Sequence, residues 1–361
     1  MRHIVLGNPA GDADSIVSTL AWAFVETLAS GKAHTPIVSI SREDLEGTRP
    51  ETSLLLKWAG VSYEDLIYMD ELPLDGSRLS KECAVTLMDH NQLVAPPLLP
   101  FQSNVVEIHD HHLDEGHHMA SCQKRNIAFR DGAALVASTC TLVVERLSTV
   151  DAAMPYPEPL STLLLGVILL DSVNLNPAAG KVTPRDRAAV NLLLEQTTWA
   201  KGQPETSDWF EHLQQAKFNP EFWKSLSVKN SLRLDYKEYA EGRLGISSVL
   251  TPVEAFLEKP NVLKGIKEYM LQTKVEYLIV MLAHDTGKEG LMREIVVCSE
   301  TSVELIVSFL VEREALAMVE QQCLDGLQDG ELLKMRVFSE RNTEVSRKVI
   351  APILMDFFSS M

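Results

Sequence analysis

Apolar and amphipathic stretches alternate through the N-terminal half of the chain and predict strands and helices in turn. RHIVLG (2–7) is a short apolar stretch that ends at glycine and predicts a buried strand. DSIVSTLAWAFVETLAS (14–30) has helical spacing, with an Asp/Ser cap at its start and Gly31 after its end. Further strands are predicted over 34–40, 84–89 and 104–110, and further helices at TSLLLKWAG, STCTLVVERL, LSTLLLGVILLDSV and TPRDRAAVNLLLEQ. The alternation indicates an α/β fold with a mostly parallel sheet flanked by helices.

The pattern weakens over residues 197–225, which are rich in Gly, Pro and polar residues. We expect a linker there, between a domain over 1–196 and a smaller α/β domain over 226–361. In the second domain, SLRLDYKEYA and GRLGISSVL predict a strand pair, and VEYLIVMLAHD and MREIVVCSE predict core strands. TPVEAFLE predicts a helix capped by Thr251, and TSVELIVSFLVE and the C-terminal segment predict two more.

Composition places the chain among ordinary globular proteins. It has 361 residues, 45% of them hydrophobic and 23% charged. No apolar run approaches the ~20 residues that a membrane helix needs, and the N-terminus meets acids too soon for a signal peptide. The five cysteines form no CxxC pair, which indicates reduced thiols. We therefore expect a cytoplasmic protein.

The formal net charge of −17 limits the partners that the surface can bind. Duplex nucleic acid and anionic membranes are bound mainly through basic patches, so we expect neither as a partner. A small polyanionic substrate is still possible, because divalent cations reverse the field inside one cleft. We expect a monomer or a weak dimer.

Four aspartates follow predicted strands. Asp12 and Asp14 come after the first strand, while Asp89 and Asp110 end two others. Ligands of α/β sheets bind outside the carboxyl ends of the strands, so these acids are placed for one cleft. Each also has a simpler interpretation, since Asp14 with Ser15 can be a helix cap and MDHN (88–91) can be a turn.

Histidines and a fifth acid add to this group. IHDHHL (108–113) offers imidazoles, which suit zinc, manganese, cobalt and iron, beside a carboxylate that can fix their tautomer. Asp171 ends the apolar stretch LLLGVILL, where a buried carboxylate is costly unless it is paired or metal-bound; a helix end at the surface is the alternative. His109 belongs to the strand end. His117 and His118 are expected to be solvated.

DxDS, DHN, DHH and an acid after an apolar helix, in this order, resemble the motifs of the DHH phosphoesterase superfamily. LDYKEY (234–239) and VSRKVIAPIL (345–354) are similar to stretches of the DHHA2 domain. The resemblance covers nearly the whole chain. It implies a DHH domain followed by a DHHA2 domain, as in family II inorganic pyrophosphatases, cytosolic exopolyphosphatases and prune proteins, with the active site in the cleft between the domains.

The first motif separates these groups. Family II pyrophosphatases have a histidine where this chain has Asn8. The GN form and the stretches LLLGVILLDSVNL, GKVTPRD and QQAKF resemble prune and exopolyphosphatases more closely. Prune usually departs from the DHH triplet, whereas this chain keeps Asp110-His111-His112, which favours an exopolyphosphatase. Inorganic pyrophosphatase, cyclic nucleotide phosphodiesterase and a partner-binding protein of the prune type remain alternatives.

The resemblance also implies roles for single residues. Two divalent cations (Mg²⁺, Mn²⁺ or Co²⁺) would be held by Asp12 and Asp14, one each, with Asp89 bridging both. His111 and Asp171 would complete the ligands of the second metal ion. Asn8 stands where the pyrophosphatases have a histidine ligand, so the first metal ion would be bound more weakly or keep an extra water. Asp110 would orient the histidines, and His112 would contact a phosphate oxygen near the scissile bond.

Substrate contacts are implied on both domains. Lys237, Arg347 and Lys348 would bind phosphate from the DHHA2 domain, since an Arg-Lys pair offers a fork and a point charge. The backbone N–H groups after Ser138, at a helix start, can also bind phosphate. Lys181 can bind a longer chain, or it can be a surface charge.

Overall fold

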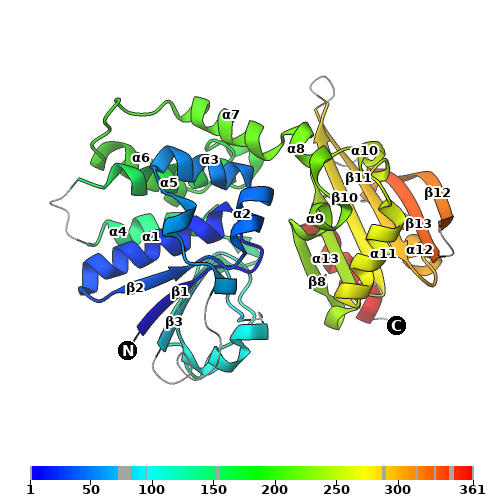
Figure 1. Ribbon diagram of the computed structural model, residues 1–361, viewed down its shortest axis with the longest axis horizontal. Helices are drawn as coiled ribbons and strands as arrows, with labels where there is room; N and C mark the ends of the chain where they lie inside the picture. The colour runs from blue at the N-terminus through cyan, green and yellow to red at the C-terminus, as the bar shows by residue number, and fades with distance from the viewer. Residues whose placement is uncertain are drawn as a thin grey trace. The chain divides into compact units, whose positions relative to one another are not determined.

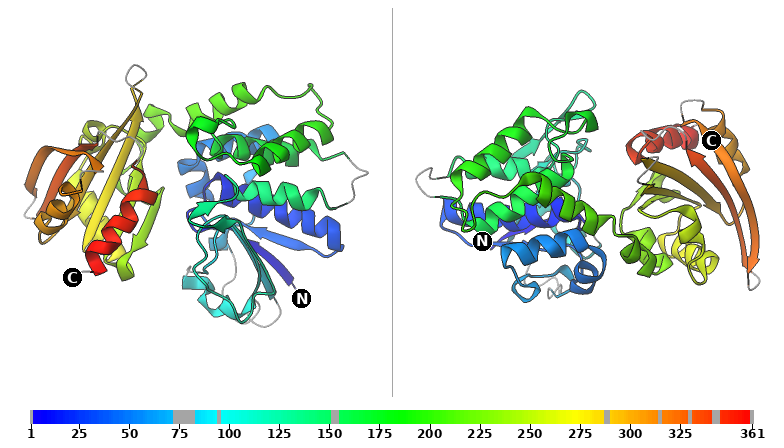
Figure 2. Two further views of the ribbon diagram at one scale, coloured as in Figure 1. Left: turned by 180° about the vertical axis from the view of Figure 1, so that it is seen from behind. Right: turned by 90° about the horizontal axis from the view of Figure 1, so that it is seen from above.

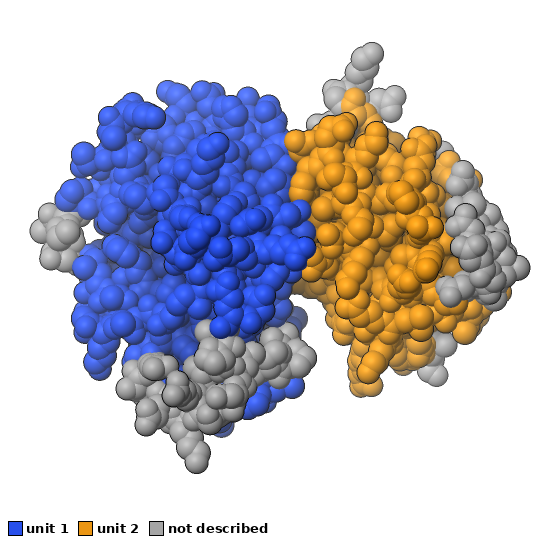
Figure 3. All heavy atoms as spheres, viewed as in Figure 1, with its two compact units in different colours: residues 1–217 blue, residues 218–361 orange. Residues whose placement is uncertain are grey.

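A computed structural model describes residues 2–71, 83–93, 96–150, 155–286, 290–313, 316–328, 331–340 and 345–359. Within these ranges, side chains are not described for residues 2, 96, 97, 285, 322–328, 331, 332, 340 and 348. The chain forms two compact units, residues 1–217 and 218–361 (Figure 3). Each is described by itself below.

Unit 1 is built on a parallel sheet in the order β2-β1-β3-β4-β5, as the apolar strand pattern predicts. The strands are β1 Arg2–Leu6, β2 His34–Ile37, β3 Cys83–Met88, β4 Val105–Asp110 and β5 Lys124–Ile127, and β6 Phe129–Arg130 pairs with β7 Ala133–Ala134. β5 is polar and partly exposed, which explains why no apolar run predicts it. Parallel pairing aligns the carboxyl ends of these strands at one edge.

Helices cover one face of this sheet in two layers (Figures 1 and 2). α1 and α4 contact the strands, and α5 packs on both of them. The helices are α1 Ala13–Ser30, α2 Arg42–Thr48, α3 Pro50–Ala59, α4 Thr139–Leu147, α5 Glu158–Asp171, α6 Pro184–Gln196 and α7 Thr206–Lys217, with 3-10 turns η1 Tyr63–Asp65, η2 Met69–Glu71, η3 Pro96–Asn104 and η4 Pro177–Ala179. Every residue of α5 from Leu160 to Leu170 is buried, as a helix that is apolar all round requires.

Unit 2 has a mixed sheet in the order β12-β13-β11-β10-β9-β8, in which the β9–β10 pair is parallel and the others are antiparallel. Its elements are α8 Pro220–Ser225, α9 Val228–Arg233, β8 Tyr236–Tyr239, η5 Ala240–Gly242, β9 Leu244–Val249, α10 Val253–Leu257, α11 Val262–Thr273, β10 Tyr277–Asp285, β11 Leu291–Ser299, α12 Glu304–Val311, β12 Met318–Gln328, β13 Glu331–Glu340 and α13 Arg347–Ser359. Separate apolar clusters form on its two faces, one with α9–α11 and one with α12 and α13.

The two-sheet α/β architecture confirms the predicted fold class. The segment predicted as a linker, 197–225, is divided between the units: α7 lies in unit 1, with Leu213 buried in its core, and α8 lies in unit 2. The β12–β13 hairpin was not predicted. No helix in the described part of the chain is long and apolar enough to cross a bilayer.

Two predicted helix caps are wrong. α1 begins at Ala13, and the cap is Asp12, whose Oδ1 accepts a hydrogen bond from the Ser15 N–H at 3.0 Å. Thr251 caps nothing in α10; Glu294 Oε2 instead accepts from the Val253 N–H at 2.8 Å. A side chain from a neighbouring strand thus replaces the local cap, which local sequence cannot reveal.

Candidate metal centre

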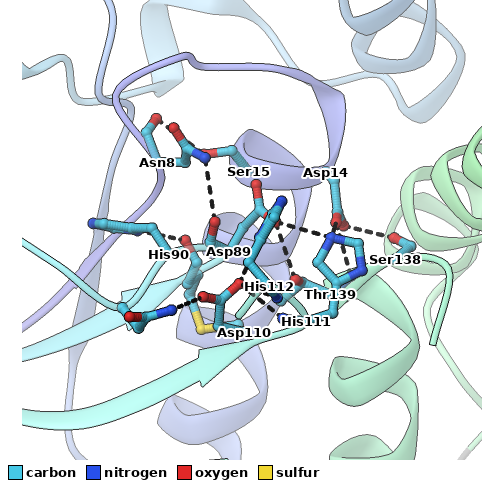
Figure 4. A network of polar contacts seen from close by, with 12 residues as sticks. Asn8, Asp14, Ser15, Asp89, His90, Asp110, His111, His112, Ser138 and Thr139 are labelled. Atoms are coloured by element: carbon cyan, nitrogen blue, oxygen red, sulfur yellow. Dashed lines mark hydrogen bonds and ion pairs between the residues drawn. The ribbon is translucent and has the colours of Figure 1, made fainter. Parts of the chain in front are cut away.

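The predicted acids of unit 1 meet at the carboxyl ends of the parallel strands. β1 leads into the loop that holds Asn8 and Asp12, β3 leads directly into Asp89, and β4 ends at Asp110. Asp14 lies in the first turn of α1 beside them (Figure 4). Parallel strands bring their carboxyl ends to one edge, which is why acids far apart in sequence converge.

Glycine allows α1 to approach this edge closely. A Cβ added to Gly7 would lie 2.5 Å from Ser15 Oγ and 2.8 Å from the Ser15 carbonyl oxygen. These separations are too short for any side chain, so Gly7 sets the distance between the first loop and the start of α1. That distance places Asp14 against the strand ends.

Asp89 is an enclosed acid at the strand ends and faces the side chains of both histidines. Its side chain is 2% exposed, and its backbone has a φ of 64°, a left-handed conformation that costs an aspartate some free energy. Its Oδ1 lies 3.5 Å from His111 Nε2 and 3.7 Å from His112 Nδ1, and accepts a hydrogen bond from Thr139 Oγ1 at 3.2 Å. Burial, followed by the charge of Asp14, raises the pKa of Asp89 well above its usual range.

Asp14 is bound to the start of α4 (Figure 4). Its carboxylate accepts from Ser138 Oγ at 2.6 Å, from the Thr139 N–H at 2.7 Å and from the Cys140 N–H at 3.0 Å. A protein carboxylate thus accepts from Ser138 and from this helix start, where phosphate contacts are predicted, and those contacts stay a prediction. Asp14 Oδ2 still lies 3.8 Å from His111 Nε2, on the side facing the other acids.

His111 presents a metal-ligating nitrogen to this group. Its Nδ1 lies 3.1 Å from the carbonyl oxygen of Val136, and a carbonyl can only accept, so Nδ1 carries the proton. Nε2 then offers its lone pair towards Asp14 and Asp89. Burial lowers the pKa of His111, despite the opposing charge of Asp14, which favours the neutral ligand form.

Asp110 accepts hydrogen bonds from both histidines of the DHH triplet. Its buried Oδ1 accepts from His112 Nδ1 at 2.8 Å and from the backbone N–H of His111 at 2.7 Å. Asn91 Nδ2 donates to Oδ2 at 2.7 Å. Burial opposes ionisation, but the hydrogen bonds from His112 and Asn91 outweigh it and hold the pKa of Asp110 below its usual range. The His112 side chain remains one-third exposed.

Asp171 and Asn8 complete the predicted unit 1 ligands. Asp171 ends α5, and its Oδ2 is buried without a hydrogen-bond partner among the described residues. Burial and the charge of Asp14 raise the pKa of Asp171 well above its usual range, while Lys217 and Lys181 partly offset this rise. Asn8 Nδ2 donates to the Asp89 carbonyl at 3.2 Å, and its Oδ1 accepts from the Ala10 N–H at 2.8 Å. Asn8 thus ties two strand ends together.

Two predicted substrate residues of unit 2 lie far apart in sequence, and the charges of both act on Asp235. Lys237 is on β8, and Arg347, the first residue of α13, forms an ion pair with Asp235 at 2.6 Å. Lys348 is the second residue of α13, and its side chain lies outside the described part. The substrate contacts of these residues stay predictions.

Three further histidines of the stretch 105–118 lie outside this group. His109 is buried on β4 against the Trp22 ring, with 3.8 Å between ring centroids. His118 was expected to be solvated, but its Nε2 accepts from the Leu93 N–H at 3.1 Å and its Nδ1 lies 3.2 Å from the Gln102 carbonyl. His117 Nε2 lies 3.5 Å from Glu115.

Two contributors carry no sequence signal of their own. Thr139 contacts both Asp14 and Asp89, and Arg49, 8% exposed, donates from Nε to the Gly11 carbonyl at 2.8 Å and from Nη2 to Ala10. Arg49 thereby holds the first loop from α3. An isolated threonine or arginine in the sequence does not reveal such a partner.

The residues present fit a divalent cation. Among the described residues, Asp89, His111 and His112 each offer one ligand atom within 4.8 Å of the other two. Oxygen and imidazole donors suit manganese, cobalt and related ions. The buried, unpartnered oxygen of Asp171 and the raised pKa values of Asp89 and Asp171 show that the cluster lacks positive charge, which cations would supply.

Known proteins resemble the whole chain. Residues 211–357 match the family model described as the DHHA2 domain. The human protein named Exopolyphosphatase PRUNE1 is 28% identical over 363 residues, covering 99% of this chain and 76% of that protein. A Schizosaccharomyces pombe protein described as an exopolyphosphatase is 25% identical over 362 residues, covering 98% and 90%.

A solved structure described as a Methanococcus jannaschii family II inorganic pyrophosphatase has the same fold. It aligns with a TM-score of 0.63 at 19% identity, over 99% of this chain and 100% of that one. The two relatives and this solved structure match the chain through both units, whereas the DHHA2 model covers residues 211–357.

Proposed function

From the premise that this chain is a hydrolase of the DHH superfamily, of the prune and exopolyphosphatase type and with a DHHA2 domain, we propose that it is a metal-dependent exopolyphosphatase. It would release orthophosphate from the ends of inorganic polyphosphate. At the level of the family, the named relatives support phosphoanhydride hydrolysis. Polyphosphate as the substrate is our inference.

One observation carries the proposal. Four acids gather near the strand ends: Asp12, Asp14, Asp89 and Asp171. Burial and the negative charges of Asp14 and Asp12 raise the pKa values of Asp89 and Asp171 well above their usual range. Like charges gathered in a buried place are unfavourable unless cations bind there. We propose that Asp12 and Asp14 each bind one divalent ion, that Asp89 binds both, and that His111 and Asp171 bind the second.

The protein groups would divide the chemistry as follows. Bound divalent ions activate a water molecule and neutralise phosphate charge. Asp110 accepts a hydrogen bond from His112 Nδ1 and so holds the ring in place, and the protonated imidazole would donate its Nε2–H to a phosphate oxygen. The substrate phosphates would be bound by Lys181, Lys237, Arg347 and Lys348. Of these, Lys181 is near enough for its charge to lower the pKa of Asp171.

The remaining predictions from the sequence belong to the same proposal. The substrate is a small polyanion, and neither a nucleic acid duplex nor a membrane surface is a partner, because the net charge of −17 opposes both. We further propose a monomer or weak dimer that works in the cytoplasm.

Phosphate release from four substrates tests the proposal. Pyrophosphate, tripolyphosphate, long-chain polyphosphate and cyclic AMP are each assayed with Mg²⁺, Mn²⁺ or Co²⁺. We expect tripolyphosphate or longer chains to give the highest kcat/KM. Highest activity on pyrophosphate would make the chain a pyrophosphatase, and highest activity on cyclic AMP would make it a phosphodiesterase.

Asn8→His tests the residue that distinguishes the two anhydride substrates. An imidazole there adds a ligand where the present amide binds the Asp89 carbonyl and the Ala10 N–H. We expect the ratio of pyrophosphate to tripolyphosphate kcat/KM to rise. An unchanged ratio would show that Asn8 does not set substrate preference.

A further inference from the structure

Asp235 and Lys237 share one side of unit 2. Asp235 comes directly before β8, and its carbonyl accepts from the Ser248 N–H at 2.8 Å, so it continues the ladder between β8 and β9. Side chains two residues apart in a strand point to the same face. The acid and the lysine therefore lie on the same face, and the charge of Lys237 acts on Asp235.

Arg347 joins this pair from the start of α13. A cation at a helix N-terminus opposes the helix dipole, so the position needs a compensating contact. Asp235 supplies it twice: Arg347 Nη1 donates to the Asp235 carbonyl at 3.0 Å, and Nη2 lies 2.6 Å from Oδ1. Partial burial opposes ionisation of Asp235, but the charge of Arg347 outweighs it and lowers the pKa of the carboxyl.

The two contacts fix the guanidinium plane without using all its donors. A guanidinium has five N–H groups, and Asp235 takes one from each terminal nitrogen. The Arg347 side chain is 17% exposed, so it has little freedom once these contacts form. The other donors keep a defined direction, as bidentate recognition of phosphate requires.

We propose that Asp235 is a positioning residue for phosphate binding, acting through Arg347. The inference rests on the proposed function, in which Arg347 binds substrate. Two effects of Asp235 oppose each other, since its charge repels a polyanion while its contacts orient the arginine. The doubled contact to a single guanidinium indicates that orientation is the larger effect.

Asp235→Asn is the test variant, because it removes the charge and keeps the shape and the backbone carbonyl. We expect KM for tripolyphosphate to rise roughly 10-fold with kcat changed much less, as loss of binding shared by ground and transition states requires. Glu276→Gln is the matched control. Glu276 pairs with Arg243 at 3.1 and 3.0 Å in the same unit, and its loss should leave KM unchanged.

A double-mutant cycle shows whether the effect passes through Arg347. In the Arg347→Ala background, Asp235→Asn should have no further effect on KM. A lower KM in Asp235→Asn, which repulsion alone predicts, would overturn the inference, as would additive effects in the cycle.

Calorimetric binding of tripolyphosphate to the same variants separates this inference from the proposed function. If the wild-type protein hydrolyses none of the substrates, the proposed function fails, and the binding cycle still tests Asp235. Weaker binding in Asp235→Asn alone, with no additional loss in the double variant, supports positioning. Equal binding in Asp235→Asn and wild type refutes it.

Discussion

Buried carboxylates on two sides of the start of α4 have different surroundings: Asp186 on one side, and the acid cluster at the strand ends on the other. Asp186 is fully buried, yet every side of it is bonded: both oxygens accept from the Ala137 N–H at 3.0 Å, Thr141 Oγ1 donates at 2.6 Å, and the Thr183 N–H and hydroxyl each donate at 2.8 Å. It also forms the capping box of α6. Its bonds link α4 to α6.

The acid cluster at the strand ends is less well satisfied. Asp14 is bonded to α4. Among the described residues, Asp89 has one side-chain donor, Thr139, besides its approach to the histidines, and Asp171 Oδ2 has no partner. Both Asp89 and Asp171 have raised pKa values, caused first by burial and then by Asp14. The comparison separates a carboxylate that stabilises the fold from carboxylates that have few protein partners.

Asp89→Asn should give the largest effect in the molecule. The amide keeps the shape but removes a central metal ligand, so we expect phosphate release to fall by about 10³-fold. Because it also removes repulsion from Asp14, the metal-free variant should unfold at the same temperature as the wild type or a higher one. Steady-state kinetics measures the rate of phosphate release, and calorimetry measures the unfolding temperature. Activity within tenfold of wild type would contradict the assignment.

Asp186→Asn should have the opposite profile. The amide nitrogen would face N–H and hydroxyl donors, leaving several of them unsatisfied in a buried place, which should cost about 3 kcal/mol of unfolding free energy. Metal affinity at low temperature should change little. Urea unfolding measures the loss. A stability equal to wild type would mean that Asp186 is not the structural member of the comparison.

Two threonines on α4 offer the smallest and most closely matched test. Thr139 Oγ1 donates to Asp89, and Thr141 Oγ1 donates to Asp186. Thr139→Val should weaken Mn²⁺ binding several-fold, equivalent to about 1 kcal/mol, with little change in stability. Thr141→Val should lower the unfolding free energy by a similar ~1 kcal/mol and leave Mn²⁺ binding intact. If both variants behaved alike, the two regions would not be functionally distinct.

The sequence predicts the strand-end acids well because their positions follow from local patterns. Apolar runs locate β1, β3 and β4, and parallel pairing then brings Asp12, Asp89 and Asp110 to one edge. The DHH pattern adds His111 and His112. Once the order of the strands in the sheet is known, no further long-range contact is needed to predict that these side chains lie close together.

What the sequence does not reveal depends on contacts between distant segments. Asp14 binds α4 across more than a hundred residues, so the helix start expected to bind phosphate is already bonded. The role of Asp186 rests likewise on Ala137 and Thr141, far along the chain. Local sequence shows that these groups can form hydrogen bonds, but only the fold decides with which partner.

Direct binding of Mn²⁺ to metal-free protein tests the central claim, that the under-bonded acids hold divalent cations. Titration followed by calorimetry and by electron paramagnetic resonance gives the number of ions per chain and their coupling. The account predicts two ions per chain, magnetically coupled as expected for centres ~3.5–4 Å apart, and loss of both the coupling and the tighter binding in Asp89→Asn. Absence of binding, or identical binding in wild type and Asp89→Asn, would contradict it.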